Sequence, residues 1–181
     1  MATTKITDGA SYINSLRNRT LAVYVLGQKV DDIVDHPLIR PSINAVAATY
    51  DLAVSQPELA SVISPFTGER ISRFLHVCTS VEDMVNQGKM QRKLGQLTGT
   101  CFQRCVGMDA FNALYSTTFE LDEQHRTAYH GRFKAFLTEM HRGNFVVGGA
   151  MTDVKGDRSL APHEQADPDM FVHVVKRTAE G

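Results

Sequence analysis

The sequence has few cysteines, no long apolar run and almost no net charge. Its 181 residues include three cysteines, an odd number that fits a reducing compartment better than a disulfide framework. The longest apolar runs, such as Leu21–Leu26, are far too short to span a bilayer. Residues Met1–Lys5 lack the apolar core of a secretory signal. We therefore expect a cytoplasmic protein without a membrane segment.

Charge gives no indication of a nucleic-acid partner. Lysine and arginine number 19 against 20 aspartates and glutamates, which gives a net charge of −1, and no run of basic residues stands out. Hydrophobic residues make up 43% of the sequence, so a packed core is expected and disorder is not. A chain of this length fits one domain, or one domain and part of another.

Apolar residues recur at helical spacing through most of the chain before Gly143. Asp8 is expected to cap a short helix, and Ser80 with Asp83 resembles a capping box at the start of a longer one. The strongest amphipathic helix includes Phe133–Met140. The middle of the chain is thus predicted to be a bundle of three or four helices.

Three segments interrupt or shorten this helical pattern. Residues 21–30 are rich in β-branched and apolar residues and predict a hairpin, with Gly27 supplying the turn. Pro57 is expected to open a short helix that continues through Ile63. The segment Phe74–Cys78 is predicted to be extended or loop-like.

The chain becomes polar and glycine-rich after Gly143. The irregular stretch continues to Pro168, which is longer than structureless loops usually are in compact domains. Residues Phe171–Lys176 then predict a strand whose edges lack a partner in this sequence. The sequence therefore looks cut short, and the expected divisions are a helical domain, a loop and the start of a β domain that is cut off: 1–147, 148–169 and 170–181.

Cys101 and Cys105 lie four residues apart in a segment that has helical spacing. Residues at i and i+4 share one helix face, with β-carbons about 6 Å apart, so two thiols there could serve one metal but could not easily form a disulfide. One interpretation is a pair of thiolate ligands for an iron–sulfur cluster or zinc, and the other is two small core residues. A closed centre needs four ligands, and only Cys78 and seven histidines remain, of which His76 is near Cys78. Arg104, between the cysteines, could pair with a carboxylate or a substrate phosphate, and a salt bridge on the helix surface is the expected arrangement.

The polar loop after residue 148 is a second candidate site. Gly156 allows close approach of the backbone to a ligand, while Lys155 and Arg158 offer donors for phosphate. Thr152 and Asp153 could hydrogen-bond a ring edge or a hydroxyl group, so the loop could hold a phosphorylated cofactor such as a flavin dinucleotide. It matches neither a GxGxxG nor a Walker sequence, and a solvated surface turn is the alternative.

Several stretches of the sequence resemble the 4-hydroxybutyryl-CoA dehydratase family. The similarity runs from about Tyr12 to the last residue. The double-cysteine segment separates this family from the flavin-dependent 4-hydroxyphenylacetate 3-monooxygenases, and both belong to a larger group with an acyl-CoA dehydrogenase-like fold. The stretches that carry the resemblance are Asp35–Asn44, Lys89–Arg92, Cys101–Ala110, Ala150–Asp153, Lys155–Arg158 and Ala166–Asp169.

The resemblance implies a mainly α fold: an acyl-CoA dehydrogenase-like N-terminal helical bundle with a small N-terminal hairpin and the first strand of a truncated β domain. It implies FAD and a 4Fe-4S cluster in each subunit of a homotetramer. Such an enzyme converts its acyl-CoA substrate, 4-hydroxybutyryl-CoA, to crotonyl-CoA by a radical mechanism and isomerises vinylacetyl-CoA. Cys101 and Cys105 match two of its three cysteine ligands. The residues that match its first FAD-contacting segment are Met151, Thr152, Asp153, Val154, Lys155, Gly156, Asp157 and Arg158.

The family's catalytic base and remaining cluster ligands fall beyond Gly181, so no catalytic residue is assigned in this sequence. We expect the 181-residue chain on its own to have little or no dehydratase activity. Two other interpretations stay open. One is a cluster-free, flavin-dependent aromatic monooxygenase of the 4-hydroxyphenylacetate 3-hydroxylase type. The other is a non-catalytic helical piece or assembly subunit, which would bind neither flavin nor iron until a C-terminal partner chain joined it.

Overall fold

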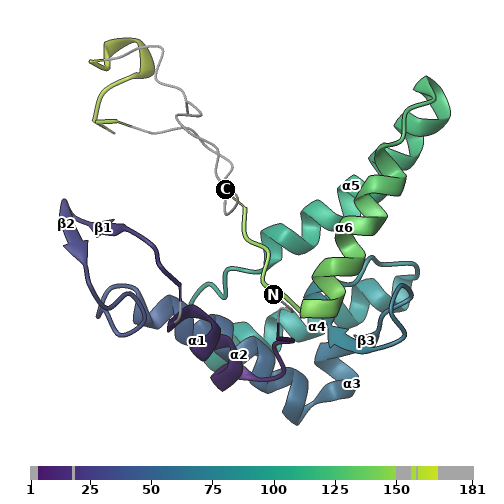
Figure 1. Ribbon diagram of the computed structural model, residues 1–181, viewed down its shortest axis with the longest axis horizontal. Coiled ribbons are helices and arrows are strands. Elements are labelled where there is room, and N and C mark those ends of the chain that lie inside the picture. Colours follow the sequence, from purple (N-terminus) through teal and green to yellow (C-terminus); the bar gives the residue numbers. More distant parts are fainter. Residues whose placement is uncertain (1–3, 18, 150–155, 158, 167–181) are drawn as a thin grey trace. The chain divides into compact units, whose positions relative to one another are not determined.

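The computed structural model describes residues 4–17, 19–149, 156–157 and 159–166. The chain divides into two compact units, Met1–Gly148 and Gly149–Gly181. Each unit is described by itself, and the finer divisions expected from the sequence stay predictions. Figure 1 shows that the described part of the first unit is predominantly helical. The expectation of a mainly α fold is therefore confirmed.

The first unit contains six α-helices, two short hairpins and one 3-10 helix within its described residues, and the second contains one further 3-10 helix. In chain order the elements are α1 (Gly9–Arg17), β1 (Val23–Val25), β2 (Gln28–Val30), α2 (Arg40–Ser55), α3 (Pro57–Ala60), β3 (Ser61–Ile63), β4 (Arg70–Ser72), η1 (Arg73–Leu75), α4 (Val81–Thr98), α5 (Cys105–His125), α6 (Tyr129–Gly143) and η2 (Pro162–Glu164).

Side-chain caps begin two of the helices, as the sequence predicts. The carboxylate of Asp8 accepts a hydrogen bond from the backbone N–H of Ser11 at 2.7 Å, ahead of α1. At the start of α4, the hydroxyl oxygen of Ser80 accepts from the N–H of Asp83 at 3.1 Å. The Asp83 carboxylate accepts in turn from the N–H of Thr79 at 3.1 Å, which completes a variant of the capping box.

The predicted N-terminal hairpin is confirmed, and a second hairpin appears where a helix was expected. β1 and β2 pair antiparallel, and both residues of their turn, Leu26 and Gly27, have positive φ angles of 50° and 79°. The helix that opens at Pro57 ends at Ala60 instead of continuing through the next three residues, which form β3 and pair with β4. The prediction of a helix through Ile63 is therefore wrong, because pairing with a distant strand outweighs the local preference.

Three clusters of buried apolar side chains form the core of the first unit. One lies between α2, α4 and the start of α5, a second between α1 and α2, and a third joins α5 and α6 to β4 and η1. Met90, Leu94 and Leu137 have no exposed surface. The predicted amphipathic helix is α6, which places Leu137 in the third cluster. Burial of such side chains is the main source of stability for the bundle.

Asn144, the residue after α6, joins three distant segments of the chain. Its φ angle of 50° ends the helix. Its side chain accepts a hydrogen bond from the N–H of Ser72 and donates one to the carbonyl of Ile6, each at 2.8 Å. Its own carbonyl accepts from the hydroxyl of Tyr50 at 2.6 Å. These buried bonds fix the chain after α6 against α2 and β4.

His141 forms a second buried polar contact on α6. Its Nε2 lies 2.8 Å from the carbonyl oxygen of Leu75 and must donate to it, so Nδ1 accepts from the hydroxyl of Ser64 at 2.7 Å. Burial lowers the pKa of His141, which favours this neutral ring. The same hydroxyl oxygen accepts from the N–H groups of Phe66 and Thr67 and so holds the turn of the second hairpin.

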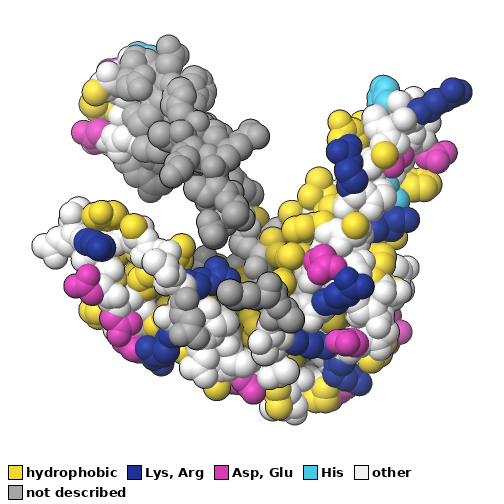
Figure 2. Space-filling model, in the orientation of Figure 1, with side chains coloured by type: hydrophobic (Ala, Val, Ile, Leu, Met, Phe, Trp, Pro, Cys, Tyr) yellow, Lys and Arg dark blue, Asp and Glu magenta, His cyan; other side chains and the backbone are white. Residues whose placement is uncertain are grey.

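Apolar side chains remain exposed on α4 and on the limb that α5 and α6 form side by side (Figure 1). On α4, Met90 and Leu94 are buried, while Val81, Met84, Val85 and Leu97 are exposed. Figure 2 shows hydrophobic side chains along the limb, and its exposed members are Leu114, Phe119, Tyr129 and Phe136. None of the helices among the described residues combines the length and the apolar character that crossing a bilayer requires.

The described part of the second unit is a short polar segment around η2. The backbone N–H of Asp157 donates to the side-chain oxygen of Gln165 at 2.9 Å, and the Asp157 carboxylate accepts from the N–H of Ser159 at 2.9 Å. The strand predicted within residues 170–181 lies outside the described residues.

Candidate cofactor site

The two cysteines singled out in the sequence do not share one helix. α5 begins at Cys105, and Cys101 precedes it in a turn without helical hydrogen bonding. Gln103 has a φ angle of 60°, in the left-handed region, and this residue breaks the helical path between the thiols. The prediction of a shared helix face is therefore wrong. We refer to residues Cys101–Cys105 as the thiol turn.

Side chains of the thiol turn alternate between the core and the surface. Phe102 and Arg104 are buried, whereas Cys101 and Gln103 are exposed and Cys105 is half-buried. Phe102 joins the cluster between α2 and α4 and packs against the ring of Phe74. The burial of alternate side chains anchors the turn and leaves the Cys101 thiol accessible. This arrangement does not fit the interpretation of both cysteines as small core residues.

A hydrogen bond and the start of a helix lie beside the two thiols. The N–H of Gln103 donates to the Sγ atom of Cys101 at 3.5 Å, and hydrogen bonds to the sulfurs of an iron–sulfur cluster tune its reduction potential. Cys105 is the first residue of a 21-residue helix, whose first N–H groups carry partial positive charge. All three cysteines are free thiols.

The thiol turn fits part of a metal site rather than a whole one. Among the residues that the structure describes, no group of three or more histidine, cysteine, aspartate or glutamate side chains could hold a metal ion. A 4Fe-4S cluster takes four protein ligands. Cys101 and Cys105 could thus supply two of the four, and the others would have to come from elsewhere.

Arg104 does not form the expected surface salt bridge, and this prediction is wrong. Its side chain is 1% exposed. The guanidinium carbon lies over the ring of Tyr50 at 4.5 Å and over the ring of Phe74 at 4.9 Å. Its Nη1 donates to the hydroxyl of Thr49 at 2.9 Å, and its Nη2 donates to the carbonyl of Phe145 at 3.4 Å. No described carboxylate pairs with it.

The first turn of α5 lies directly against the chain that follows α6. A Cβ atom added at Gly107 would lie 2.1 Å from the carbonyl oxygen of Val147. Only glycine permits this approach without a shift of the backbone. The contact fixes the start of α5, and Cys105 with it, against the end of the first unit.

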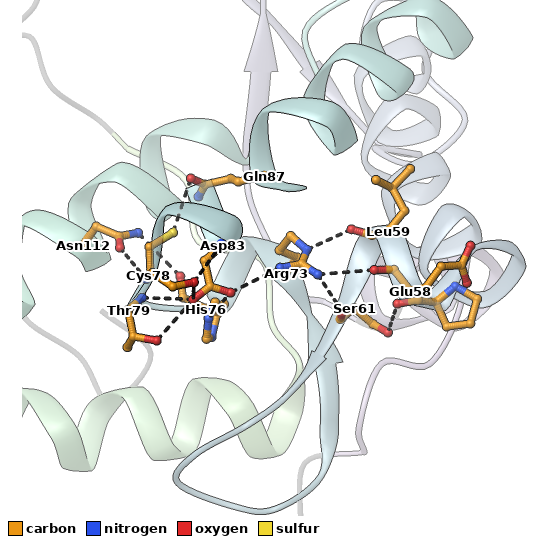
Figure 3. A network of polar contacts seen from close by, with 12 residues as sticks. Glu58, Leu59, Ser61, Arg73, His76, Cys78, Thr79, Asp83, Gln87 and Asn112 are labelled. Atoms are coloured by element: carbon orange, nitrogen blue, oxygen red, sulfur yellow. Dashed lines mark hydrogen bonds and ion pairs between the residues drawn. The ribbon is translucent and has the colours of Figure 1, made fainter. Parts of the chain in front are cut away.

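His76 and Cys78 belong to a different cluster, at the start of α4 (Figure 3). We refer to this cluster as the α4 network. The Nε2 atom of His76 lies 3.1 Å from Oδ1 of Asp83, and Nη1 of Arg73 lies 3.7 Å from the same oxygen. Burial alone would raise the pKa of Asp83, but the N–H of Thr79 and the His76 side chain lower it to about 2. Members of the α4 network are Arg73, His76, Cys78, Thr79, Asp83, Gln87 and Asn112.

Cys78 has structural partners within the α4 network. Its backbone N–H donates to the side-chain oxygen of Asn112 at 2.7 Å, and its thiol donates to the side-chain oxygen of Gln87 at 3.5 Å. Burial and the charge of Asp83 raise the pKa of the Cys78 thiol. A thiol held in this protonated state is a poor nucleophile and a poor metal ligand.

Residues 8–181 match the family described as 4-hydroxyphenylacetate 3-hydroxylase N terminal. The chain belongs to this family. It is 49% identical over 173 residues to the 4-hydroxybutyryl-CoA dehydratase/vinylacetyl-CoA-Δ-isomerase of Clostridium aminobutyricum, a match that covers 94% of this chain and 35% of that protein. It is 23% identical over 176 residues to the oxygenase component of 4-hydroxyphenylacetate 3-monooxygenase from Geobacillus sp. (strain PA-9), covering 96% of this chain and 35% of that protein.

Solved structures show the same fold. An oxygen-tolerant archaeal 4-hydroxybutyryl-CoA dehydratase from N. maritimus superposes with a TM-score of 0.83 at 59% identity, over 97% of this chain and 35% of that one. The oxygenase component of 4-hydroxyphenylacetate 3-monooxygenase, in complex with FAD and 4-hydroxyphenylacetate, gives a TM-score of 0.63 at 19% identity, over 96% of this chain and 36% of that one. The acyl-CoA dehydrogenase-like helical fold is thereby confirmed. This member of the family spans about a third of the length of these relatives.

The predicted flavin segment of this family member is described only in part. Gly156 has a positive φ of 57°, which glycine adopts readily, and Asp157 forms local hydrogen bonds. The other members, Met151–Lys155 and Arg158, lie outside the described residues. Contact of this segment with FAD stays a prediction.

Proposed function

We propose that this chain is the N-terminal portion of a dehydratase that converts 4-hydroxybutyryl-CoA to crotonyl-CoA by a radical mechanism and also isomerises vinylacetyl-CoA. The observation that carries the proposal is the thiol turn, with an exposed Cys101 ahead of α5 and Cys105 as its first residue. The identity of 49% to the Clostridium dehydratase and of 59% to the archaeal one supports it. A cytoplasmic location is part of the same proposal.

Each unit of the chain would contact one cofactor: the first unit the cluster and the second unit FAD. Cys101 and Cys105 would hold a 4Fe-4S cluster, and residues Met151–Arg158 would contact FAD. When bound, the cluster supplies a Lewis acid for the departing hydroxyl group of the substrate and the flavin supplies a one-electron acceptor. We place the catalytic base and the other cluster ligands outside the described residues.

The chain's own contribution to this chemistry is a fixed position for two sulfur donors. Phe102 and Arg104 hold the thiol turn from the core side, and Gly107 lets α5 lie against the chain after α6. A ligand pair held by packed side chains keeps its geometry better than one on a free loop. The helical bundle therefore acts as a rigid wall for one side of the site.

The exposed apolar side chains of α4 and the α5–α6 limb support a larger assembly. Val81 and Met84 are 77% and 63% exposed, and Phe119 on the limb is 53% exposed. Several large apolar side chains exposed on one element often mark a protein–protein contact. We propose that other subunits of a homotetramer, or a C-terminal partner chain, cover it.

A domain replacement tests the proposed function. This chain would replace the N-terminal third of the Clostridium dehydratase, and the chimera would be reconstituted anaerobically with iron, sulfide and FAD. We expect the chimera to form crotonyl-CoA from 4-hydroxybutyryl-CoA. The matched Cys101→Ser chimera should lose iron and lose activity by about 100-fold or more, because one cluster ligand is missing.

Two outcomes would contradict the proposal. One is a folded chimera that binds FAD but forms no crotonyl-CoA, and the other is an iron content that does not depend on Cys101. The 181-residue chain alone, reconstituted in the same way, should show little or no turnover. Clear turnover by the 181-residue chain would show that this chain alone supplies all the ligands of the cluster.

A further inference from the structure

Arg104 is the largest fully buried side chain of the described structure, and no described acid neutralises its charge. Its Nε atom has no hydrogen-bond partner within the described part of the chain. A buried charge without a counter-charge is unfavourable, and an apolar residue of similar volume would avoid that cost. The position between Cys101 and Cys105 suggests a use for the charge.

The contacts of Arg104 join the thiol turn to three other parts of the first unit. Thr49 and Tyr50 belong to α2, Phe74 belongs to η1, and Phe145 follows α6. The planar guanidinium is held between two aromatic rings while its edge donates two hydrogen bonds. A lysine could keep the charge but not this combination of stacking and paired donors.

We propose that Arg104 is the positioning residue of the thiol pair: it fixes the turn so that Cys101 and Cys105 reach one metal centre, and it supplies positive charge behind that anionic centre. This inference rests on the proposed function, because it assumes that the two thiols bind one metal. The new element is the buried Arg104, which touches no metal itself but determines how tightly the two thiols bind the metal.

Cadmium binding to the 181-residue chain tests the inference without flavin or catalysis. Cd²⁺ binds thiolates strongly, and its binding gives an ultraviolet sulfur-to-metal charge-transfer band. All variants would carry Cys78→Ser, so that only the two thiols of the turn remain. Thermal unfolding of each variant would be measured alongside the titration, to show that the chain is folded.

The expected order of cadmium affinity follows from the two roles of the guanidinium. Arg104→Met, which removes both the charge and the paired donors, should weaken binding by about 10-fold or more. Arg104→Lys keeps the charge, so its cadmium affinity should lie between that of Arg104→Met and that of the parent. This partial rescue would not occur if the residue only filled space. The control Arg132→Met removes an exposed arginine that lies 4.8 Å over the ring of Tyr129 and should leave affinity unchanged.

Different failures point to different conclusions. If folded Arg104→Met binds Cd²⁺ within about twofold of the parent, the positioning role is wrong while the thiol site stands. If Cys101→Ser in the same background does not weaken binding, the two-thiol site is absent, and both the proposed function and this inference are overturned. Should Arg104→Met not fold, Thr49→Val, which removes one hydrogen-bond acceptor of the guanidinium, replaces it. A folded Thr49→Val variant with unchanged affinity would then overturn the inference.

Discussion

The thiol turn and the α4 network contain similar residues and use them differently. Each has a buried arginine and a cysteine beside the first turn of a long helix. In the α4 network, Asp83 pairs with Arg73 and His76, and Cys78 is held by protein partners. In the thiol turn, Arg104 has no acidic partner among the described residues, and Cys101 is exposed.

This difference separates structural polar groups from candidate ligands. In the α4 network a carboxylate faces the arginine and the histidine, and such paired charges stabilise the fold, while Nδ1 of His76 has no hydrogen-bond partner among the described residues. In the thiol turn, the charge of Arg104 has no described counter-charge and the Cys101 thiol is exposed, an arrangement that suits an external anion or metal centre. Four measurements test this difference: two on the α4 network, one on the first turn of α5, and one that contrasts the two regions.

The largest effect on stability is expected from Asp83→Ala. The change removes the charge that pairs with Arg73 and His76 together with the acceptor of the Thr79 N–H, so the free energy of unfolding should fall by about 3 kcal/mol. Urea unfolding measures this. The matched control is Glu82→Ala, an exposed neighbour in the same helical turn, which should cost less than about 1 kcal/mol. Equal effects of the two changes would show that the α4 network contributes no special stability.

The second effect is acid sensitivity. The pKa of Asp83 is lowered from 3.8 to about 2, so its contribution is complete above pH 3.8 and is lost as the pH falls toward 2. Unfolding free energies measured from about pH 5 down to about pH 2 should decline less steeply for Asp83→Asn than for the parent. An identical decline in both proteins would be inconsistent with this assignment.

The third effect concerns the first turn of α5. Gly107→Ala places a Cβ atom 2.1 Å from the carbonyl oxygen of Val147 and should lower stability by about 2 kcal/mol. Gly95→Ala on α4 is the control, because nothing lies within 4 Å of its added Cβ. It should raise stability by up to about 1 kcal/mol, since alanine favours the helix more. Thermal unfolding compares the two, and a stabilising Gly107→Ala would show that α5 does not lie against this segment.

The smallest effect on stability is expected from Cys101→Ser. This side chain is exposed, so the free energy of unfolding should change by less than about 0.5 kcal/mol. The contrasting change is Asn112→Ala, which removes the acceptor of the Cys78 N–H in the α4 network and should cost about 1.5 kcal/mol. A strongly destabilising Cys101→Ser would assign a structural role to that thiol.

Local patterns in the sequence predicted most of the helical elements. Asp8 and Ser80 are short polar residues ahead of apolar periodicity, and both cap helices in the structure. Gly27 marked the first hairpin correctly. These features depend on neighbours within a few residues, which is why one sequence suffices to find them.

Features that depend on distant contacts were not predictable. Residues Ser61–Ile63 form a strand only because Arg70–Ser72 lie beside them. The spacing of Cys101 and Cys105 gave no indication that Gln103 adopts a left-handed conformation. The burial of Arg104 was also missed, because it depends on contacts with α2, η1 and the chain after α6.

Location of iron in the reconstituted chimera is the most direct test of the proposed site. Anomalous diffraction at the iron edge would show where the metal lies. The account predicts an iron peak bonded to the sulfur atoms of both Cys101 and Cys105. An ordered thiol turn without an iron peak, in crystals that contain iron elsewhere, would contradict it.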